Sequence, residues 1–167
     1  MHVDRPARAQ TKPLYTAAQR IRRDATRWTL VQGVLAPLQF LVFLASLALV
    51  ARFLVSERGQ EVATLSIIVK TMLLYTIMIT GSIWEKRVFG RFLFAEAFFW
   101  EDMFSMIVLA LHTAYLVALF SHALDVRAQM AIALAAYASY VVNAAQFVLK
   151  LRAARIQAPF VAAQVVS

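Results

Sequence analysis

The chain has 167 residues, of which 62% are hydrophobic and 16% are charged. Soluble domains contain roughly half apolar and a quarter charged residues, so this composition excludes an ordinary soluble domain and indicates an integral membrane protein. The net charge of +8 does not indicate nucleic-acid binding, because the basic residues lie in the first 27 residues and at the ends of apolar runs. Without a cysteine, the chain has no disulfide, no thiolate metal site and no thiol nucleophile.

The first segment, residues 1–27, is a basic tail expected on the cytoplasmic side. We expect a short helix from Thr16 to Arg27 that lies on the bilayer surface, with its arginines facing anionic headgroups. The alternative is that these charges act only as a cytoplasmic retention signal. The tail is too long and too polar for the n-region of a signal peptide, so no cleavage is expected.

Four apolar stretches follow, each long enough to cross about 30 Å of hydrocarbon at about 1.5 Å per residue. Within a membrane domain at 28–155, they are predicted at residues 28–50, 62–84, 103–124 and 128–149. Residues 156–167 form an apolar C-terminal tail. Thirteen Lys and Arg residues lie on the side of both termini and three in the other two loops, so the positive-inside rule places both termini in the cytoplasm. The predicted fold is therefore an all-α integral membrane four-helix bundle.

The loop between the second and third spans, Glu85 to Glu101, is rich in Phe and Trp. Part of it is predicted to be a second interfacial helix, because FGRFLFAEAFFW is amphipathic and too short to span. Trp84 and Trp100 are also typical of the aromatic belts at membrane interfaces. Glu101 and Asp102 open the third span, where carboxylates also act as ordinary helix caps.

Polar residues inside the spans predict a pocket that opens on the cytoplasmic side. Glu101, Ser105 and His112 recur on one face of the third span, and helical rise places His112 about 16 Å from Glu101. An ionisable residue in mid-membrane is functional by default, although a histidine bonded to a neighbouring helix is the alternative. Lys70 in the second span is expected to snorkel to the interface, to pair inside the bundle or to contact a ligand.

Amides extend this polar lining on the first and fourth spans. Gln39 lies on one face of the first span, and Asn143 and Gln146 share a face of the fourth. Such amides are alternatively no more than interhelical contacts, worth about 0.6 kcal/mol each. The sequence contains no HxxxH or ExxH spacing, so no metal site of the protein is predicted. The lining suits an apolar, planar ligand at the membrane interface.

Five segments are long and unusual in composition: WTLVQGVLAPLQFLVF (28–43), VKTMLLYTIMITGSIWEK (69–86), GRFLFAEAFFWEDMFSM (90–106), LALHTAYL (109–116) and YVVNAAQFVLKLRAAR (140–155). Through them the chain resembles the 3-vinyl bacteriochlorophyllide hydratase family of phototrophic bacteria. The resemblance implies addition of water to the C3-vinyl group of a magnesium chlorin or bacteriochlorin, which gives a 3-(1-hydroxyethyl) pigment in bacteriochlorophyll biosynthesis. It also implies no dissociable cofactor, since the magnesium belongs to the substrate, and a location in the bacterial inner membrane.

For this chemistry we expect Glu101 to donate a proton to the vinyl group and Asp102 to position or activate the water. His112 is expected to ligate the substrate magnesium or to share the acid–base work. The expected substrate-binding residues are Gln39, Lys70, Trp84, Glu85, Arg91, Glu96, Trp100, Ser105, Asn143 and Gln146. The expected partners are the pigment, membrane lipid, other pigment-biosynthesis enzymes and a second copy of the chain.

Two other classes of protein remain as alternatives. A non-catalytic protein that binds chlorophyllides and hands them between enzymes needs the same pocket and His112, but not the acids. A small transporter or lipid-binding membrane protein is disfavoured because the spans lack helix-breaking glycines. The pair Glu101 and Asp102 therefore distinguishes the enzyme from the carrier.

Overall fold

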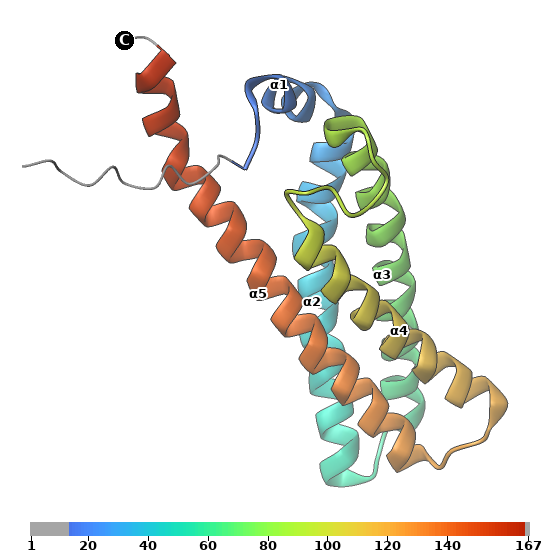
Figure 1. Cartoon of the computed structure of the whole chain (residues 1–167). Helices are drawn as coiled ribbons and strands as arrows, with labels where there is room; N and C mark the ends of the chain where they lie inside the picture. The colour runs from blue at the N-terminus through green and yellow to red at the C-terminus, as the bar shows by residue number, and fades with distance from the viewer. Residues whose placement is uncertain (1–13, 166–167) are drawn as a thin grey trace, which may run out of the picture.

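The structure, a computed structural model, describes residues 14–165, and it describes the side chains of residues 14–155. The regular structure in this range is helical: α1 (Ala17–Ala25), α2 (Arg27–Ser56), α3 (Gln60–Phe89), α4 (Phe99–Ser121) and α5 (Val126–Val165). Four of these helices, α2 to α5, are long and apolar enough to cross a membrane, and the helical structure confirms the all-α class. Figure 1 shows two antiparallel hairpins, α2 with α3 and α4 with α5, and α1 lies across the end where α2 begins.

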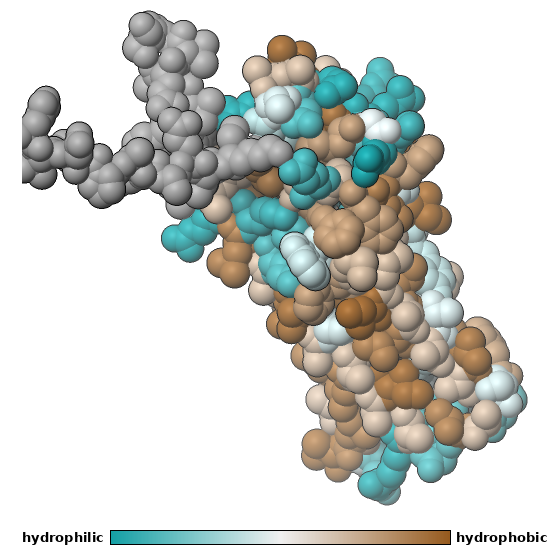
Figure 2. All heavy atoms as spheres, viewed as in Figure 1, coloured by the Kyte–Doolittle hydropathy of each residue, from teal (hydrophilic) through white to brown (hydrophobic). Residues whose placement is uncertain are grey.

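The surface of the bundle has the polarity of a protein embedded in lipid. Figure 2 shows apolar residues over the middle of the molecule and hydrophilic residues gathered at its two ends. Large apolar side chains of the spans point outward, for example Leu30 with 72% and Phe120 with 70% of its surface exposed. Lipid solvates these side chains, whereas water would not.

The core lies where the two hairpins meet. The ring of Phe43 on α2 contacts Tyr137 and Tyr140 of α5, with ring centroids 5.5 and 5.0 Å apart. Val108 of α4 and Ile67 of α3 are fully buried in the same cluster. Because lipid is as apolar as this core, close packing between the helices stabilises it rather than exclusion of water.

The end of the bundle opposite α1 is closed by two short connections. The turn between α2 and α3 uses left-handed backbone at Glu57 and Gly59, with φ of 56° and 81°. Arg127 at the start of α5 forms an ion pair with Glu57 across the two hairpins. Both side chains are exposed, so this pair contributes at most about 1 kcal/mol.

The short helix expected between Thr16 and Arg27 is present as α1. Thr16 and Gln19 form a capping box, in which each side chain accepts the other residue's backbone N–H. Tyr15, just before the helix, is buried against the ring of Phe89, and the Arg23 guanidinium lies 4.9 Å from its ring centroid. Burial raises the pKa of the Tyr15 hydroxyl above its ordinary value. These contacts attach α1 to the end of α3.

The prediction of an interfacial helix between the second and third spans is wrong, because residues 90–98 form bends and turns. The preceding helix also ends later than predicted, at Phe89 instead of residue 84. Gly90 ends it with φ of 87°, a conformation that glycine adopts without strain. We refer to residues 90–98 as the aromatic loop. Two backbone N–H groups of this loop donate to carboxylate side chains, whereas in a helix they would donate to backbone carbonyl oxygens.

The last two helices differ from their predicted bounds in opposite ways. α4 begins at Phe99 and ends at Ser121, before the predicted residue 124. α5 continues to Val165, well beyond the predicted residue 149. The cluster of basic residues at 150–155 marks a change of polarity, and the alanine-rich sequence around it keeps its helical preference.

Candidate functional site

Three carboxylates lie together where α3 ends and α4 begins. Glu85 of α3 and Glu101 and Asp102 of α4 are 5%, 6% and 3% exposed. The carboxyl groups of Glu85 and Asp102 lie within hydrogen-bonding reach of each other. Because a carboxylate has only acceptors, a hydrogen bond between two carboxyl groups requires a proton on one of them. The two groups are thus placed to hold one proton between them, and we call Glu85 and Asp102 the carboxyl pair.

The aromatic loop is bound directly to the carboxyl pair. The N–H of Phe94 donates to Asp102 Oδ2 at 2.7 Å, and the N–H of Ala95 donates to Glu85 Oε2 at 3.2 Å. Phe94 has a φ of 58°, which costs energy for a residue other than glycine. The two hydrogen bonds hold this strained backbone in place and fix the orientation of both carboxyl groups.

Glu101 has a different partner from its neighbour Asp102. Lys150 of α5 forms an ion pair with Glu101 and also donates to the carbonyl oxygen of Ala97 in the aromatic loop. The side chain of Glu101 is 8% exposed and that of Lys150 is 27% exposed, so the carboxylate is shielded from water and the ammonium is partly hydrated. An ion pair requires Glu101 to be an anion, and an anionic carboxylate has no proton to donate.

Lys70 and His112 meet in the middle of the bundle. Lys70 Nζ lies 2.8 Å from His112 Nε2, and both side chains are fully buried. His112 Nδ1 lies 2.8 Å from the carbonyl oxygen of Val108, which only accepts, so Nδ1 carries the hydrogen and Nε2 accepts from Lys70. The ammonium also lies 4.3 Å from the ring centroid of Tyr140. Of the three predicted alternatives for Lys70, the structure shows pairing inside the bundle.

This geometry argues against His112 as a ligand of the substrate magnesium. Both ring nitrogens of His112 are used within the protein. A metal ligand needs a free lone pair on a ring nitrogen, and Lys70 occupies that of Nε2. Among residues 14–155, no cluster of three His, Asp or Glu side chains is arranged to hold a metal ion.

The predicted amides lie between the carboxylates and the Lys70–His112 pair. Asn143 Nδ2 donates to Ser105 Oγ at 2.9 Å, which joins α5 to α4. Both amide atoms of Gln39, the carbonyl oxygen of Asn143 and that of Gln146 have no hydrogen-bond partner among the described residues. Gln39 is 2% exposed, so these atoms are separated from bulk water.

Comparisons with known proteins assign the chain to a family. The family model of 2-vinyl bacteriochlorophyllide hydratase matches residues 15–153, a range that contains the carboxylates, the Lys70–His112 pair and the amides. The chain belongs to this hydratase family. The family expected from the sequence motifs is therefore confirmed; the vinyl position numbered 2 in this name is position 3 in systematic tetrapyrrole numbering.

Two curated relatives of this hydratase-family chain carry the same name. The 2-vinyl bacteriochlorophyllide hydratase of Rhodobacter capsulatus is 65% identical over 153 residues, which cover 92% of this chain and 89% of the relative. That of Cereibacter sphaeroides is 65% identical over 151 residues, which cover 89% and 92%. No solved structure matches the chain significantly.

The remaining predicted site residues of the hydratase-family chain lie nearer the surface of the same end. Arg91, Glu96 and Trp100 are exposed, so none of them is buried with the carboxylates. Trp84 is half-buried, and its indole N–H donates to Thr29 Oγ1 at 3.0 Å. Trp84 therefore ties α3 to α2 and does not form a separate belt.

Lys150 is the site residue that sequence reasoning missed. It lies on the same helical face as Gln146 and Asn143, four residues after the first and seven after the second. That spacing was visible in the sequence, but the partner on α4 was not. Glu85 was expected to orient the substrate from a loop, and the structure instead buries it on α3 beside Asp102.

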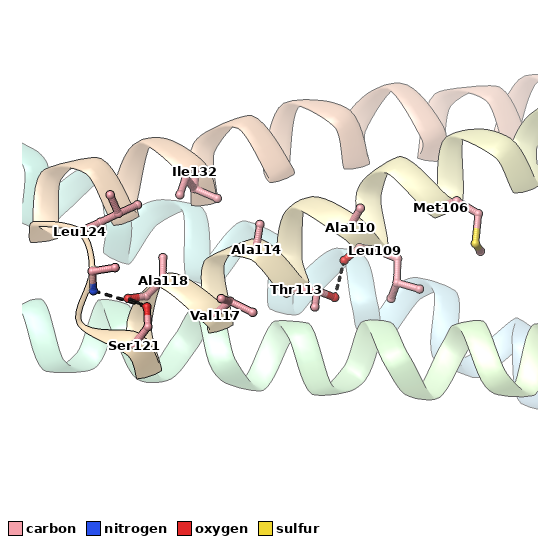
Figure 3. Close-up of a pocket in the computed structure, with 11 residues that line it drawn as sticks. Met106, Leu109, Ala110, Thr113, Ala114, Val117, Ala118, Ser121, Leu124 and Ile132 are labelled. Carbon is pink, nitrogen blue, oxygen red and sulfur yellow. Dashed lines mark hydrogen bonds between the residues drawn. The ribbon is translucent and has the colours of Figure 1, made fainter.

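Two hollows lie away from the carboxylates. One, of about 640 Å³, runs along α4 past Met106, Thr113 and Val117 (Figure 3) and is almost entirely apolar. At about 100° per residue these side chains point to the opposite face of α4 from Glu101 and His112, so this groove is not the predicted pocket. The other, of about 390 Å³, lies beside α1 and is lined by Arg22, Ala25, Thr26, Arg27, Trp28 and Arg87.

Proposed function

We propose that this chain is a hydro-lyase that adds water to the C3-vinyl group of chlorophyllide a or 3-vinyl bacteriochlorophyllide, on the route to bacteriochlorophyll. The product is the 3-(1-hydroxyethyl) pigment. The observation that carries the proposal is the buried Glu85–Asp102 carboxyl pair in a chain 65% identical to two proteins named 2-vinyl bacteriochlorophyllide hydratase.

Hydration of a vinyl group needs an acid first and a nucleophile second. The π electrons of the vinyl group take a proton at the terminal carbon, and the resulting cation on the inner carbon is delocalised into the macrocycle. Water then forms the C–O bond at the inner carbon, and its surplus proton returns to the conjugate base of the acid. A single positioned carboxyl group therefore serves as acid in the first step and as base in the second.

The carboxyl pair is better suited to this role than Glu101. Glu85 and Asp102 lie close enough to hold one proton between them, and two loop N–H groups donate to their oxygens. Glu101 is an anion in its ion pair with Lys150. We therefore assign proton transfer to Asp102 with Glu85 as its partner, and we assign to Glu101 the positioning of the aromatic loop through Lys150.

The proposal requires no dissociable cofactor, because the carboxyl pair supplies the proton and solvent supplies the water. The substrate magnesium stays with the macrocycle. Lys70 donates to His112 inside the bundle and so ties α3 to α4.

We place both termini on the cytoplasmic side of a bacterial inner membrane, with the site opening to the same side. Figure 1 shows α1 and the far end of α5 at the end of the bundle that carries the aromatic loop, and most Lys and Arg residues belong to this end. The exposed rings of Phe92, Phe99 and Trp100 offer flat apolar surfaces to a macrocycle that arrives along the interface. Arg91 pairs with its propionate.

A membrane assay tests the proposal. The chain is expressed in a host without pigments, chlorophyllide a is added to its membranes, and mass spectrometry follows the gain of one water. We expect a hydrated product that disappears in a Glu85→Gln/Asp102→Asn double variant. Pigment that remains bound but unhydrated in the unaltered chain would instead support the non-catalytic carrier.

A further inference from the structure

Polar atoms without a partner lie in the interior of the bundle. Both amide atoms of Gln39 and the side-chain carbonyl oxygens of Asn143 and Gln146 bond to no other described residue. Buried polar groups in proteins are nearly always hydrogen-bonded, so an orphaned one needs an explanation, of which a bound water molecule is one. Only 2% of the surface of Gln39 is exposed, so bulk solvent does not supply its hydrogen bonds.

Contacts between α2 and α5 place Gln39 and Asn143 at the same depth. The rings of Phe43 and Tyr140 touch, with centroids 5.0 Å apart. Gln39 lies one turn from Phe43 toward the carboxylates, and Asn143 lies one turn from Tyr140 in the same direction, because the two helices are antiparallel. The two amide residues therefore lie at the same depth, one turn from the aromatic core toward the carboxylates.

The same level connects to the carboxyl pair through α4. Asn143 donates to Ser105, and Ser105 follows Asp102 by three residues, a rise of about 4.5 Å. Gln146 lies nearly one turn beyond Asn143 toward the end that carries the carboxylates. The orphaned amides thus lie about one helical turn from Asp102, toward the middle of the bundle.

The hydrogen-bonding pattern identifies the bound molecule. Three of the four orphaned atoms are acceptors, the carbonyl oxygens of Gln39, Asn143 and Gln146, and they need donors. The edge of a magnesium chlorin presents keto, ester and carboxylate oxygens, which only accept, and its ring nitrogens hold the metal. Water both donates to these carbonyls and accepts from the Gln39 NH₂ group.

We propose that Gln39, Asn143 and Gln146 bind the water molecule that is added to the vinyl group, a role that rests on the hydratase function proposed above. These residues hold the nucleophile and not the macrocycle, contrary to the expectation from sequence. Once the vinyl group is protonated, an oxygen lone pair of this water forms the C–O bond, and its surplus proton passes to the carboxylate left by the first step.

Deuterium separates protonation from water addition. In D₂O, a cation that is not captured by water loses a proton and returns to the vinyl pigment with deuterium on its terminal carbon. We expect Gln39→Leu and Asn143→Leu to lower the hydration rate about tenfold or more. The recovered vinyl substrate should carry more deuterium than that recovered from the unaltered chain. Mass spectrometry measures both quantities in one sample.

Matched variants keep the test decisive. Gln32→Leu removes an amide of the same helix that already donates to Thr80 Oγ1 at 2.8 Å, so its hydration and deuteration should match the unaltered chain. Glu85→Gln/Asp102→Asn should show neither hydration nor deuterium. Gln39→Met preserves the length of the side chain and replaces Gln39→Leu if that variant does not fold.

Two outcomes would overturn the water site alone. In one, the folded Gln39 and Asn143 variants hydrate the pigment as fast as the unaltered chain. In the other, hydration and deuterium incorporation fall together, which means that the amides support protonation or folding. Absence of hydration by the unaltered chain would instead remove the proposed function itself.

Discussion

Glu101 and Asp102 are neighbours in the chain, but their different partners predict opposite results for the two amide substitutions. Asp102→Asn keeps an oxygen that accepts the N–H of Phe94, so the aromatic loop stays in place, but it removes the proton shared with Glu85. General acid–base groups contribute about 10²- to 10⁴-fold. Turnover should therefore fall by this factor, which is about 3–5 kcal/mol at about 1.4 kcal/mol per tenfold.

Glu101→Gln should affect stability instead of turnover. It converts a charge-assisted hydrogen bond to Lys150 into a weaker one, and such bonds contribute about 1.5–3 kcal/mol. The side chain of Lys150 is 27% exposed, so water screens the pair and the loss should lie near the lower figure. Turnover should stay within about tenfold, because no proton is transferred by Glu101.

Both quantities are measured on the same preparations. Initial hydration rates at saturating chlorophyllide a give turnover, and thermal unfolding in detergent gives the change in stability. Lys150→Met should cost more than Glu101→Gln, since it leaves the buried Glu101 carboxylate without its cation and also removes the hydrogen bond to the carbonyl oxygen of Ala97. The assignment is refuted if Glu101→Gln abolishes turnover in a folded protein while Asp102→Asn retains it.

Three further predictions concern stability, each checked by unfolding in detergent. His112→Leu leaves the buried Lys70 amino group without its acceptor and should cost about 1–3 kcal/mol. The double variant that adds Lys70→Met should lose less, and equal losses would contradict the pairing. Gly90→Ala, at φ of 87°, should cost about 1–2 kcal/mol, whereas Gly33→Ala, in open space within α2, should gain up to about 1 kcal/mol. Burial raises the pKa of Tyr15 in the folded protein, so its contribution to the free energy of unfolding is complete below pH 10. This contribution is lost as the pH rises through the pKa of the folded state, and Tyr15→Phe should lack this loss of stability at alkaline pH.

Features set by local periodicity were predictable from the sequence. Residues that recur every three or four positions on the third span, namely Glu101, Ser105, Val108 and His112, are all buried in the structure. Gln39 lies on the buried face of α2 for the same reason. A helix turns by a fixed angle per residue, so the sequence alone determines which side chains share a face.

Pairings between helices were not predictable, because they depend on how the hairpins pack. Lys70 had three open alternatives until α4 placed His112 beside it. The end of α3 was misplaced for a related reason: Glu85 looked like a loop residue, since a charge normally ends an apolar run. Its burial is stabilised by contacts with Asp102 and Ala95, which one span cannot reveal.

The contacts of Lys150 with Glu101 and Ala97 have a consequence for the order in which the protein folds. The contacts of Glu85 with Ala95 and of Asp102 with Phe94 span ten and eight residues, so they can form as soon as α4 leaves the ribosome. Glu101 must wait for Lys150, which is synthesised forty-nine residues later. The aromatic loop therefore gains its contact with Lys150 only after the fourth span is inserted. The end of the molecule that carries the carboxylates is the last part to fold.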